Sequence, residues 1–124
     1  MNIKTVVIDN KVIAVVECDE VCIKDTQTAL DFMMSVNYET GSNYVAINKE
    51  AFAHDFYVLS TRLAGEVLQK FVTYRFKLAI IGDYSMYTSK PLKDFMYECK
   101  SGTDIFFVPS TEEALERLSK ATAN

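Results

Sequence analysis

The side chains best suited to acid–base chemistry are the one histidine of the chain and two carboxylates close to it in sequence. His54 is followed directly by Asp55, a pair that could serve as a base and the group that orients it. Neighbouring side chains rarely face each other, however, and no serine or cysteine occupies a nucleophile-elbow motif. Glu66 flanks an apolar helical face, where a buried functional acid and a solvated position are both open. An enzyme that uses His54, Asp55 and Glu66 is therefore the less favoured hypothesis.

The cysteine and glycine patterns predict neither a metal site nor a bound cofactor. Cys18, Cys22 and Cys99 form an odd set without a CxxC pair, so we expect free thiols in a reducing compartment. The chain has four glycines and lacks both GxGxxG and GxxxxGK[ST]. Without such a glycine-rich loop the backbone cannot cradle a phosphate in the known ways. We therefore predict no cofactor and no metal.

Composition and charge indicate an ordinary globular protein. Hydrophobic residues make up 49% and charged residues 24% of the 124-residue chain, and the net charge is −4. Lysine and arginine are scattered, which argues against nucleic acid as a partner because phosphate binding needs them clustered. No apolar run approaches the roughly twenty residues that span a bilayer, and residues 1–4 do not resemble a signal peptide. We expect a cytoplasmic protein without a membrane span.

The first half of the chain predicts a hairpin, a helix and a strand. Apolar runs at residues 5–8 and 12–16 are separated by the polar turn 9–11, which is typical of a β-hairpin. Asp25 can cap a helix whose apolar residues recur at helical spacing, and Gly41 is suited to end it. Residues 44–47 then predict a third strand.

The second half alternates helices and strands. A less regular passage, 48–59, precedes a helix with Ala64, Val67, Leu68 and Phe71 on one face. Strands are predicted at 78–81 and 105–108. A helix capped by Ser89 lies between these strands and ends at Gly102, and a last helix follows Ser110, which has capping-box spacing to Glu113.

These elements follow the order ββαβαβαβα. Repeated βα units imply a largely parallel sheet with right-handed crossovers, and the hairpin makes the first strand antiparallel to the second. We therefore predict a single α/β domain over residues 1–124, built on one five-stranded sheet.

The carboxyl ends of the parallel strands are the expected place for a site. Loops and helix N-termini converge there. The loop 82–88 contains two tyrosines and a methionine, residue types that are enriched where proteins meet partners. The alternative is that the rings fold back over the sheet edge. The candidate partner or ligand residues at this rim are Asn48, Lys49, Asp83, Tyr84, Ser85 and Tyr87.

The succession of elements is similar to that of the sulfate-transporter and anti-sigma-factor-antagonist (STAS) superfamily. In that superfamily Asp-Ser-Ser-Gly-Leu-Gly opens the second helix, and one of the serines is phosphorylated by a partner kinase. The corresponding segment here is 59–64, in which Ser60, Thr61 and Leu63 match while Leu59 and Arg62 replace the aspartate and the glycine. The resemblance implies a switch at Ser60 or Thr61, with Arg62 beside it.

Two further resemblances concern the rest of the chain. Residues 78–83, 105–107 and 112–115 look like an antagonist-like branch of the STAS superfamily. Residues 38–39, 48–50, 63–66, 68–71 and 87–90 resemble an uncharacterised bacterial family, a domain of unknown function. The second resemblance implies a bacterial setting and a fold but no activity.

Three hypotheses remain open at this stage. The leading one is a non-catalytic regulatory or protein-interaction module, with phosphate favoured at Ser60 or Thr61 because a helix start stabilises anions. A hydroxyl that only caps the helix is the competing interpretation, and a helix that starts near Asp55 would place both hydroxyls inside it. The second hypothesis is a small-molecule or lipid-binding domain, and the third is the enzyme. A protein partner is expected, and a homodimer is open.

Overall fold

The computed structural model describes residues 1–121, and within this range it holds one five-stranded sheet and four α-helices. The predicted order ββαβαβαβα is confirmed. Between β3 and α2 the chain forms three short 3-10 turns, η1 (Lys49–Ala51), η2 (His54–Tyr57) and η3 (Leu59–Thr61). The strands are β1 (Asn2–Ile8), β2 (Lys11–Glu17), β3 (Tyr44–Asn48), β4 (Lys77–Ile81) and β5 (Ile105–Val108), and the helices are α1 (Thr26–Thr40), α2 (Leu63–Thr73), α3 (Lys90–Lys100) and α4 (Thr111–Lys120).

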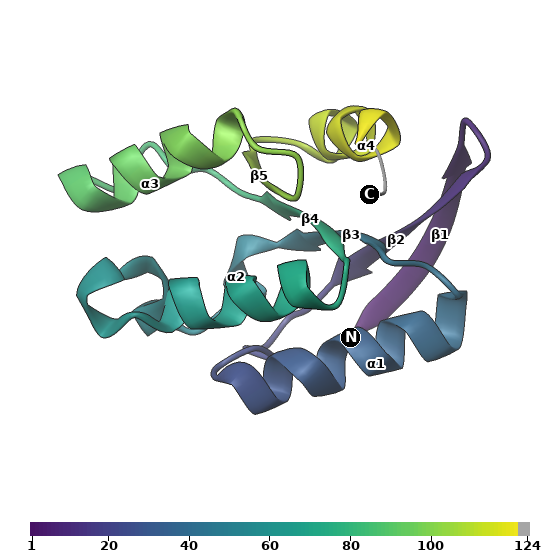
Figure 1. Cartoon of the computed structure of the whole chain (residues 1–124), viewed down its shortest axis with the longest axis horizontal. Coiled ribbons are helices and arrows are strands. Elements are labelled where there is room, and N and C mark those ends of the chain that lie inside the picture. Colours follow the sequence, from purple (N-terminus) through teal and green to yellow (C-terminus); the bar gives the residue numbers. More distant parts are fainter. Residues whose placement is uncertain (122–124) are drawn as a thin grey trace.

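The strands lie side by side in chain order, β1-β2-β3-β4-β5. β1 is antiparallel to β2, and the other neighbours are parallel, as predicted. Because each parallel strand is added on the same side of the last, the right-handed crossovers bring α1, α2 and α3 to one face of the sheet. α4 follows the last strand and covers the opposite face, away from α1 and α2 (Figure 1).

The two faces of the sheet are packed differently. The face under α1, α2 and α3 carries a large aromatic core, in which Phe32 of α1 and Phe71 of α2 lie 6.4 Å apart between ring centroids. The α4 face is lined by small residues, among them Ala46, Ala79 and Ala114. Alternate residues of each strand serve the two cores, and the alanines let α4 approach the sheet closely.

Local signals define the ends of several elements. The Asp25 carboxylate accepts a hydrogen bond from the Thr28 backbone N–H at 2.8 Å, and Gly41 ends α1 in the left-handed conformation with φ 74°. Both ends of α1 are therefore where the sequence predicts them. The hairpin turn consists of Asp9 and Asn10 alone, both with positive φ, the combination required by a two-residue type I′ turn.

One boundary differs from the prediction. β1 begins at Asn2, three residues before the apolar run at 5–8, because pairing with β2 continues through polar residues to Glu17. α2 begins at Leu63, just after Ser60 and Thr61 as predicted, and not at the alternative start near Asp55, because residues 54–61 form 3-10 turns. Within residues 1–121, no helix combines the length and apolarity that crossing a membrane requires.

Candidate functional site

Asn48 links two neighbouring connections at the carboxyl ends of the strands. Its Oδ1 accepts a hydrogen bond from the Cys18 backbone N–H, and its Nδ2 donates to the Cys18 carbonyl, both at 2.8 Å. The side chain thus completes a pair of backbone-like hydrogen bonds where β2 ends. Both ends of the amide are used in holding the chain after β2 against the end of β3.

Lys49, Tyr57 and Tyr87 form a packed cluster at the same carboxyl ends of the strands. The Lys49 ammonium donates to the Tyr87 hydroxyl at 3.0 Å and lies 4.9 Å from the centre of that ring. The Tyr57 hydroxyl donates to the Lys49 carbonyl at 2.7 Å, and the rings of Tyr57 and Tyr87 stack with centroids 5.3 Å apart. A Cβ added at Gly82 would collide with the Lys49 side chain, so this approach depends on the glycine. The cluster is closely packed and its polar groups bond to one another.

The tyrosines of the loop between β4 and α3 fold back over the sheet edge. The Tyr84 hydroxyl donates to the Ile80 carbonyl at 2.8 Å, and its ring meets Phe107 edge-on at 5.6 Å. Burial raises the pKa of the Tyr57 and Tyr84 hydroxyls above the ordinary tyrosine value. The rings therefore support the loop from below and do not project toward solvent.

Asp83 and Ser85 lie at the outer side of this loop. The Ser85 backbone N–H donates to the Asp83 carboxylate at 2.9 Å, and hydrogen bonding from Ser85 lowers the pKa of the Asp83 carboxyl. Met86, next in the loop, is 83% exposed. Met86 is therefore exposed on the loop, while the neighbouring rings of Tyr84 and Tyr87 pack against the sheet.

Exposed apolar side chains stand on three successive βα connections. Val21 follows β2 and is 51% exposed, Val58 follows β3 and is 38% exposed, and Met86 follows β4. Because β2, β3 and β4 are parallel, these connections all lie at the carboxyl ends of the strands. We call the surface formed by Val21, Val58 and Met86 the C-terminal rim.

The candidate switch residues lie directly before α2. Ser60 and Thr61 are exposed in η3, and Arg62 precedes the helix with φ 66°. The Thr61 hydroxyl lies 2.7 Å from the Asp55 carbonyl and 2.8 Å from the Val58 carbonyl, so its proton is used in closing the turn. Within residues 1–121 the Ser60 hydroxyl has no protein partner, which makes it the freer of the two.

The residues considered for catalysis lie on separate elements. His54 and Asp55 are exposed in η2, and Glu66 is exposed in the first turn of α2. In the described part of the chain, no hydrogen bond or ion pair joins these three side chains, and no group of three potential metal ligands is found. The structure does not assemble them into an acid–base site.

Cys18 and Cys22 come together in the connection after β2. Their sulfur atoms are 3.0 Å apart, and burial together with the neighbouring Cys18 raises the pKa of the Cys22 thiol to about 12. Burial also raises the pKa of Cys99 to about 11. Cys22 and Cys99 are therefore weak nucleophiles at neutral pH. The proximity of Cys18 and Cys22 was not predicted from the sequence, although their four-residue spacing in a tight connection is a signal for it.

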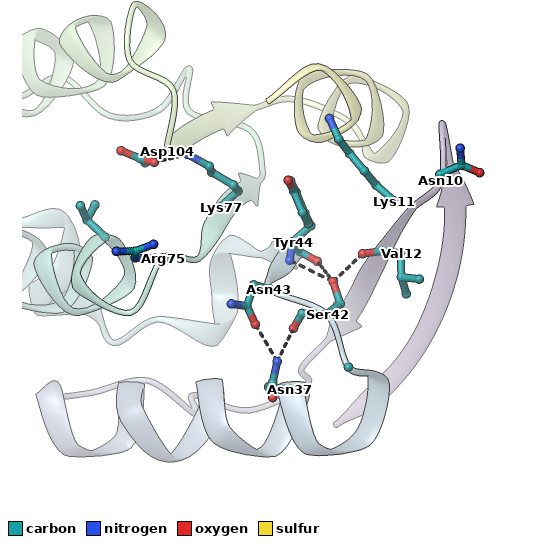
Figure 2. A pocket seen from close by; sticks show the side chains of 12 residues that line it. Asn10, Lys11, Val12, Asn37, Ser42, Asn43, Tyr44, Arg75, Lys77 and Asp104 are labelled. Carbon is teal, nitrogen blue, oxygen red and sulfur yellow. Dashed lines mark hydrogen bonds and ion pairs between the residues drawn. The ribbon is translucent and has the colours of Figure 1, made fainter. Parts of the chain in front are cut away.

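A second candidate region lies at the amino ends of the strands, and unlike the first it contains polar groups that remain accessible. A cavity of about 780 Å³ opens there, a volume in the range of small-molecule sites. We call it the N-terminal pocket (Figure 2). Its lining comes from the hairpin turn, the connection between α1 and β3, the end of α2 and the starts of β4 and β5, and it includes Asn10, Lys11, Asn37, Ser42, Asn43, Tyr44, Arg75, Lys77 and Asp104.

Two cations of the N-terminal pocket are engaged by the protein. Lys77 is 5% exposed and its ammonium pairs with the Asp104 carboxylate at 2.5 Å. The Lys11 ammonium donates to the carbonyls of Ser119 and Ala121 at 2.5 and 2.8 Å, where a cation stabilises the C-terminus of α4. Figure 2 shows the Lys77–Asp104 pair on one side of the pocket and Lys11 on the other.

Among the donors that line the N-terminal pocket, those of Asn43 and Arg75 have no partner within residues 1–121. The Asn43 Oδ1 accepts from Asn37 Nδ2 at 2.6 Å, which leaves the Asn43 amide NH2 free to donate. Within residues 1–121 the exposed Arg75 guanidinium makes no hydrogen bond or ion pair. The sequence pattern pointed to the carboxyl ends of the strands and did not predict this pocket. Asparagines clustered in the turns at the other ends were the signal that could have found it.

Comparison with known families identifies a match over most of the chain. The family model described as "Domain of unknown function (DUF4180)" matches residues 8–118. This confirms the expected similarity to a family without an assigned function. No curated protein matches the chain.

Proposed function

We propose that this chain, which belongs to the DUF4180 family, is a non-catalytic regulatory module that binds a protein partner through its C-terminal rim. The element order supports the proposal through its similarity to the STAS superfamily. Because one fold can host many functions, that similarity carries less weight than the surface itself.

The observation that carries the proposal is the contrast between the rim and its base. Val21, Val58 and Met86 are exposed apolar side chains on three connections that the chain holds in place by internal hydrogen bonds and ring stacking. A surface fixed in this way loses little conformational entropy when a partner covers it. Exposed methionine and valine beside polar groups have the character of a small protein interface.

Ser60 gives this interface a means of regulation. It lies two residues from Val58 and three residues before the start of α2, and Arg62 stands between it and the helix. A phosphate on Ser60 would add close to two negative charges beside the rim, where the first N–H groups of α2 and the Arg62 guanidinium can stabilise it. Partner affinity would then change without a change in the core.

A paired set of variants tests the proposal. A photo-crosslinking residue is placed in the rim, at Val21, and crosslinked proteins are compared between the unsubstituted rim and the Val58→Asp/Met86→Asp variant. The matched control is Tyr38→Asp, an exposed aromatic near the end of α1, which lies at the opposite end of the strands. We expect a defined partner that is lost with the rim variant and kept with Tyr38→Asp. Identical crosslinks in all three proteins would contradict the proposal.

Regulation is tested with Ser60→Glu and Thr61→Glu once a partner has been isolated. Ser60→Glu should change partner affinity while leaving the melting temperature almost unchanged. Thr61→Glu should lower the melting temperature, because the Thr61 hydroxyl closes the turn before α2. Equal partner affinity for Ser60→Glu, Ser60→Gln and the unsubstituted protein would remove the switch and leave the interface.

The N-terminal pocket favours a second candidate function, the binding of a small anion. In the part of the chain that the structure describes, Arg75 and the Asn43 amide NH2 have no partner, and the volume of about 780 Å³ suits a compact carboxylate or phosphate. Titration with citrate or inorganic phosphate, followed by amide NMR shifts, should move resonances of Asn43 and Arg75. Arg75→Gln should abolish the shifts, and Arg62→Gln, the matched control at the other end of the strands, should not. Shifts that are absent or spread evenly over the surface would exclude this site.

A further inference from the structure

β1 leaves one edge of the sheet open. Its seven residues pair with β2 only, and within residues 1–121 no element pairs with the other side of the strand. Figure 1 shows β1 at the border of the molecule, beyond β2. An open edge presents unpaired N–H and C=O groups that can pair with another strand.

The hairpin determines which groups point outward. Ile8 and Lys11 flank the two-residue turn, and in such a hairpin the flanking residues form a hydrogen-bonded pair. Because hydrogen-bonded and non-hydrogen-bonded pairs alternate, the even-numbered residues of β1 bond to β2. The odd-numbered residues Ile3, Thr5 and Val7 therefore direct their backbone N–H and C=O groups toward the open edge.

This edge lacks most of the features that usually prevent pairing. β1 contains no proline, and its register with β2 runs one to one from Asn2 to Ile8 without a bulge. Its only charged side chain, Lys4, belongs to the set that bonds to β2. Val7 is 66% exposed, which is unusual for a branched apolar residue in a strand. The opposite edge strand, β5, has only four residues.

We propose that the β1 edge binds the β1 edge of a second copy of this chain. The two strands run antiparallel about a two-fold axis at Thr5, so that two five-stranded sheets join into one continuous sheet. Because the contact is isologous, it closes at two copies and uses up both open edges. The proposal is independent of the partner at the C-terminal rim.

The register follows from the outward-facing residues. With the axis at Thr5, Thr5 lies opposite its counterpart, and Ile3 lies opposite Val7 of the other copy. All three outward-facing residues then find a partner, and the exposed Val7 gains an apolar neighbour on the same face. A register centred on Val7 would bring the hairpin turn of one copy against Thr5 of the other and would leave Ile3 unpaired.

The flank of α1 adds apolar area to the same face. Phe32 points toward α2, where its ring meets Phe71, so Leu30 and Met34 lie on the other flank of α1, toward β1. Met34 is half-exposed. In the paired sheet the two α1 helices lie on the same face on either side of the axis. A stable interface needs about 1,000 Å² or more, which strand pairing alone does not supply.

A cysteine at the axis tests the register directly. Paired residues at a hydrogen-bonded position have Cα atoms about 5.5 Å apart, within the range a disulfide can bridge. Thr5→Cys should therefore form a dimer linked through the two introduced thiols under mild oxidation with copper–phenanthroline. Peptide mass spectrometry identifies this link and separates it from links at the native cysteines. Lys4→Cys is the matched control, because its two copies lie diagonally at about 7–8 Å. Equal crosslinking of both variants, or none, would overturn the register.

The association itself is tested by sedimentation equilibrium. The unsubstituted protein should sediment with twice the mass of the chain, and Val7→Lys should raise the dissociation constant at least about tenfold, because two valines of the dimer lose their apolar neighbours. Val72→Lys is the matched control, an exposed valine of α2 away from the edge. Because Val7 and Val72 are both exposed, neither substitution should lower the melting temperature of the monomer. A monomeric unsubstituted protein, or a dimer that Val7→Lys does not weaken, would overturn the proposal.

Discussion

The two ends of the parallel strands have opposite characters. At the carboxyl ends, the polar groups of Asn48, Lys49 and Tyr57 bond to other parts of the chain, and exposed apolar residues stand above them. At the amino ends, a polar cavity remains open, and within residues 1–121 the donors of Arg75 and Asn43 have no partner. Parallel sheets usually hold their ligands at the carboxyl ends. Here that end is filled, and the cavity is at the other end.

The lengths of the connections account for the difference. The chain between β3 and α2 is long enough to form three 3-10 turns, which fold over the carboxyl end of the sheet and bury Phe56 and Tyr57. The connections that enter β3 and β4 comprise only residues 41–43 and 74–76. Such short turns join the elements but carry too few side chains to fill the space between them. A rigid filled surface suits a protein partner, whereas a hollow with spare donors suits a small ligand.

The largest loss of stability is expected from a substitution that removes a buried ring at the carboxyl ends of the strands. Tyr57→Ala removes a buried ring that packs against Phe56 and Tyr87 and anchors the Lys49 carbonyl. We expect a loss of about 3–5 kcal/mol in the free energy of unfolding, measured by urea denaturation. Tyr38→Ala, at a fully exposed ring, should cost less than about 0.5 kcal/mol. Similar losses for both variants would show that the carboxyl end is not packed as described.

Two asparagines test the same contrast in hydrogen bonding. Asn48→Ala leaves the Cys18 N–H and C=O without partners, and we expect a loss of about 1–3 kcal/mol in the free energy of unfolding. Asn43→Ala removes one exposed contact with Asn37, so its cost should be about 0.5 kcal/mol or less. Urea denaturation of both variants measures the difference. Equal costs would contradict the assignment of Asn48 as a structural link.

Alkaline pH should weaken the filled end selectively. The pKa of Tyr57 and Tyr84 is raised in the folded state, so between about pH 10 and that raised pKa the unfolded chain has lost protons that the folded chain keeps. Stability is therefore complete below about pH 10 and falls as pH rises, by up to about 1.4 kcal/mol per pH unit for each tyrosine. Tyr57→Phe should reduce this slope in urea denaturation measured at several pH values. An unchanged slope would place the Tyr57 hydroxyl in contact with water.

The smallest change in the free energy of unfolding is expected at the amino ends of the strands, in the N-terminal pocket. Arg75→Gln removes a guanidinium that the described residues do not engage, so the free energy of unfolding should change by less than about 0.5 kcal/mol. Thermal unfolding in the absence of added anions measures this change. A substantial loss would mean that Arg75 supports the fold, and it would remove the best donor from the proposed small-anion site.

Local signals in the sequence determined the elements and their order. Asp25 and Gly41 define both ends of α1, because a cap and a left-handed glycine act within one turn of the helix. The apolar runs and the turn at Asp9 and Asn10 define the hairpin, and the βα alternation defines the parallel sheet. Membership of a domain-of-unknown-function family was also predictable from the residues.

Only the tertiary structure decided which side chains meet. The choice between exposed and inward-folded tyrosines remained open in the sequence, because it depends on Ile80, Phe107 and Tyr57, which lie in other elements. The N-terminal pocket joins segments from the first turn to the start of β5, and the β1 edge is open because no other strand within residues 1–121 reaches it. Caps and periodicities act over a few residues, whereas cavities and edges depend on how distant segments pack, which the spacing of residue types does not encode.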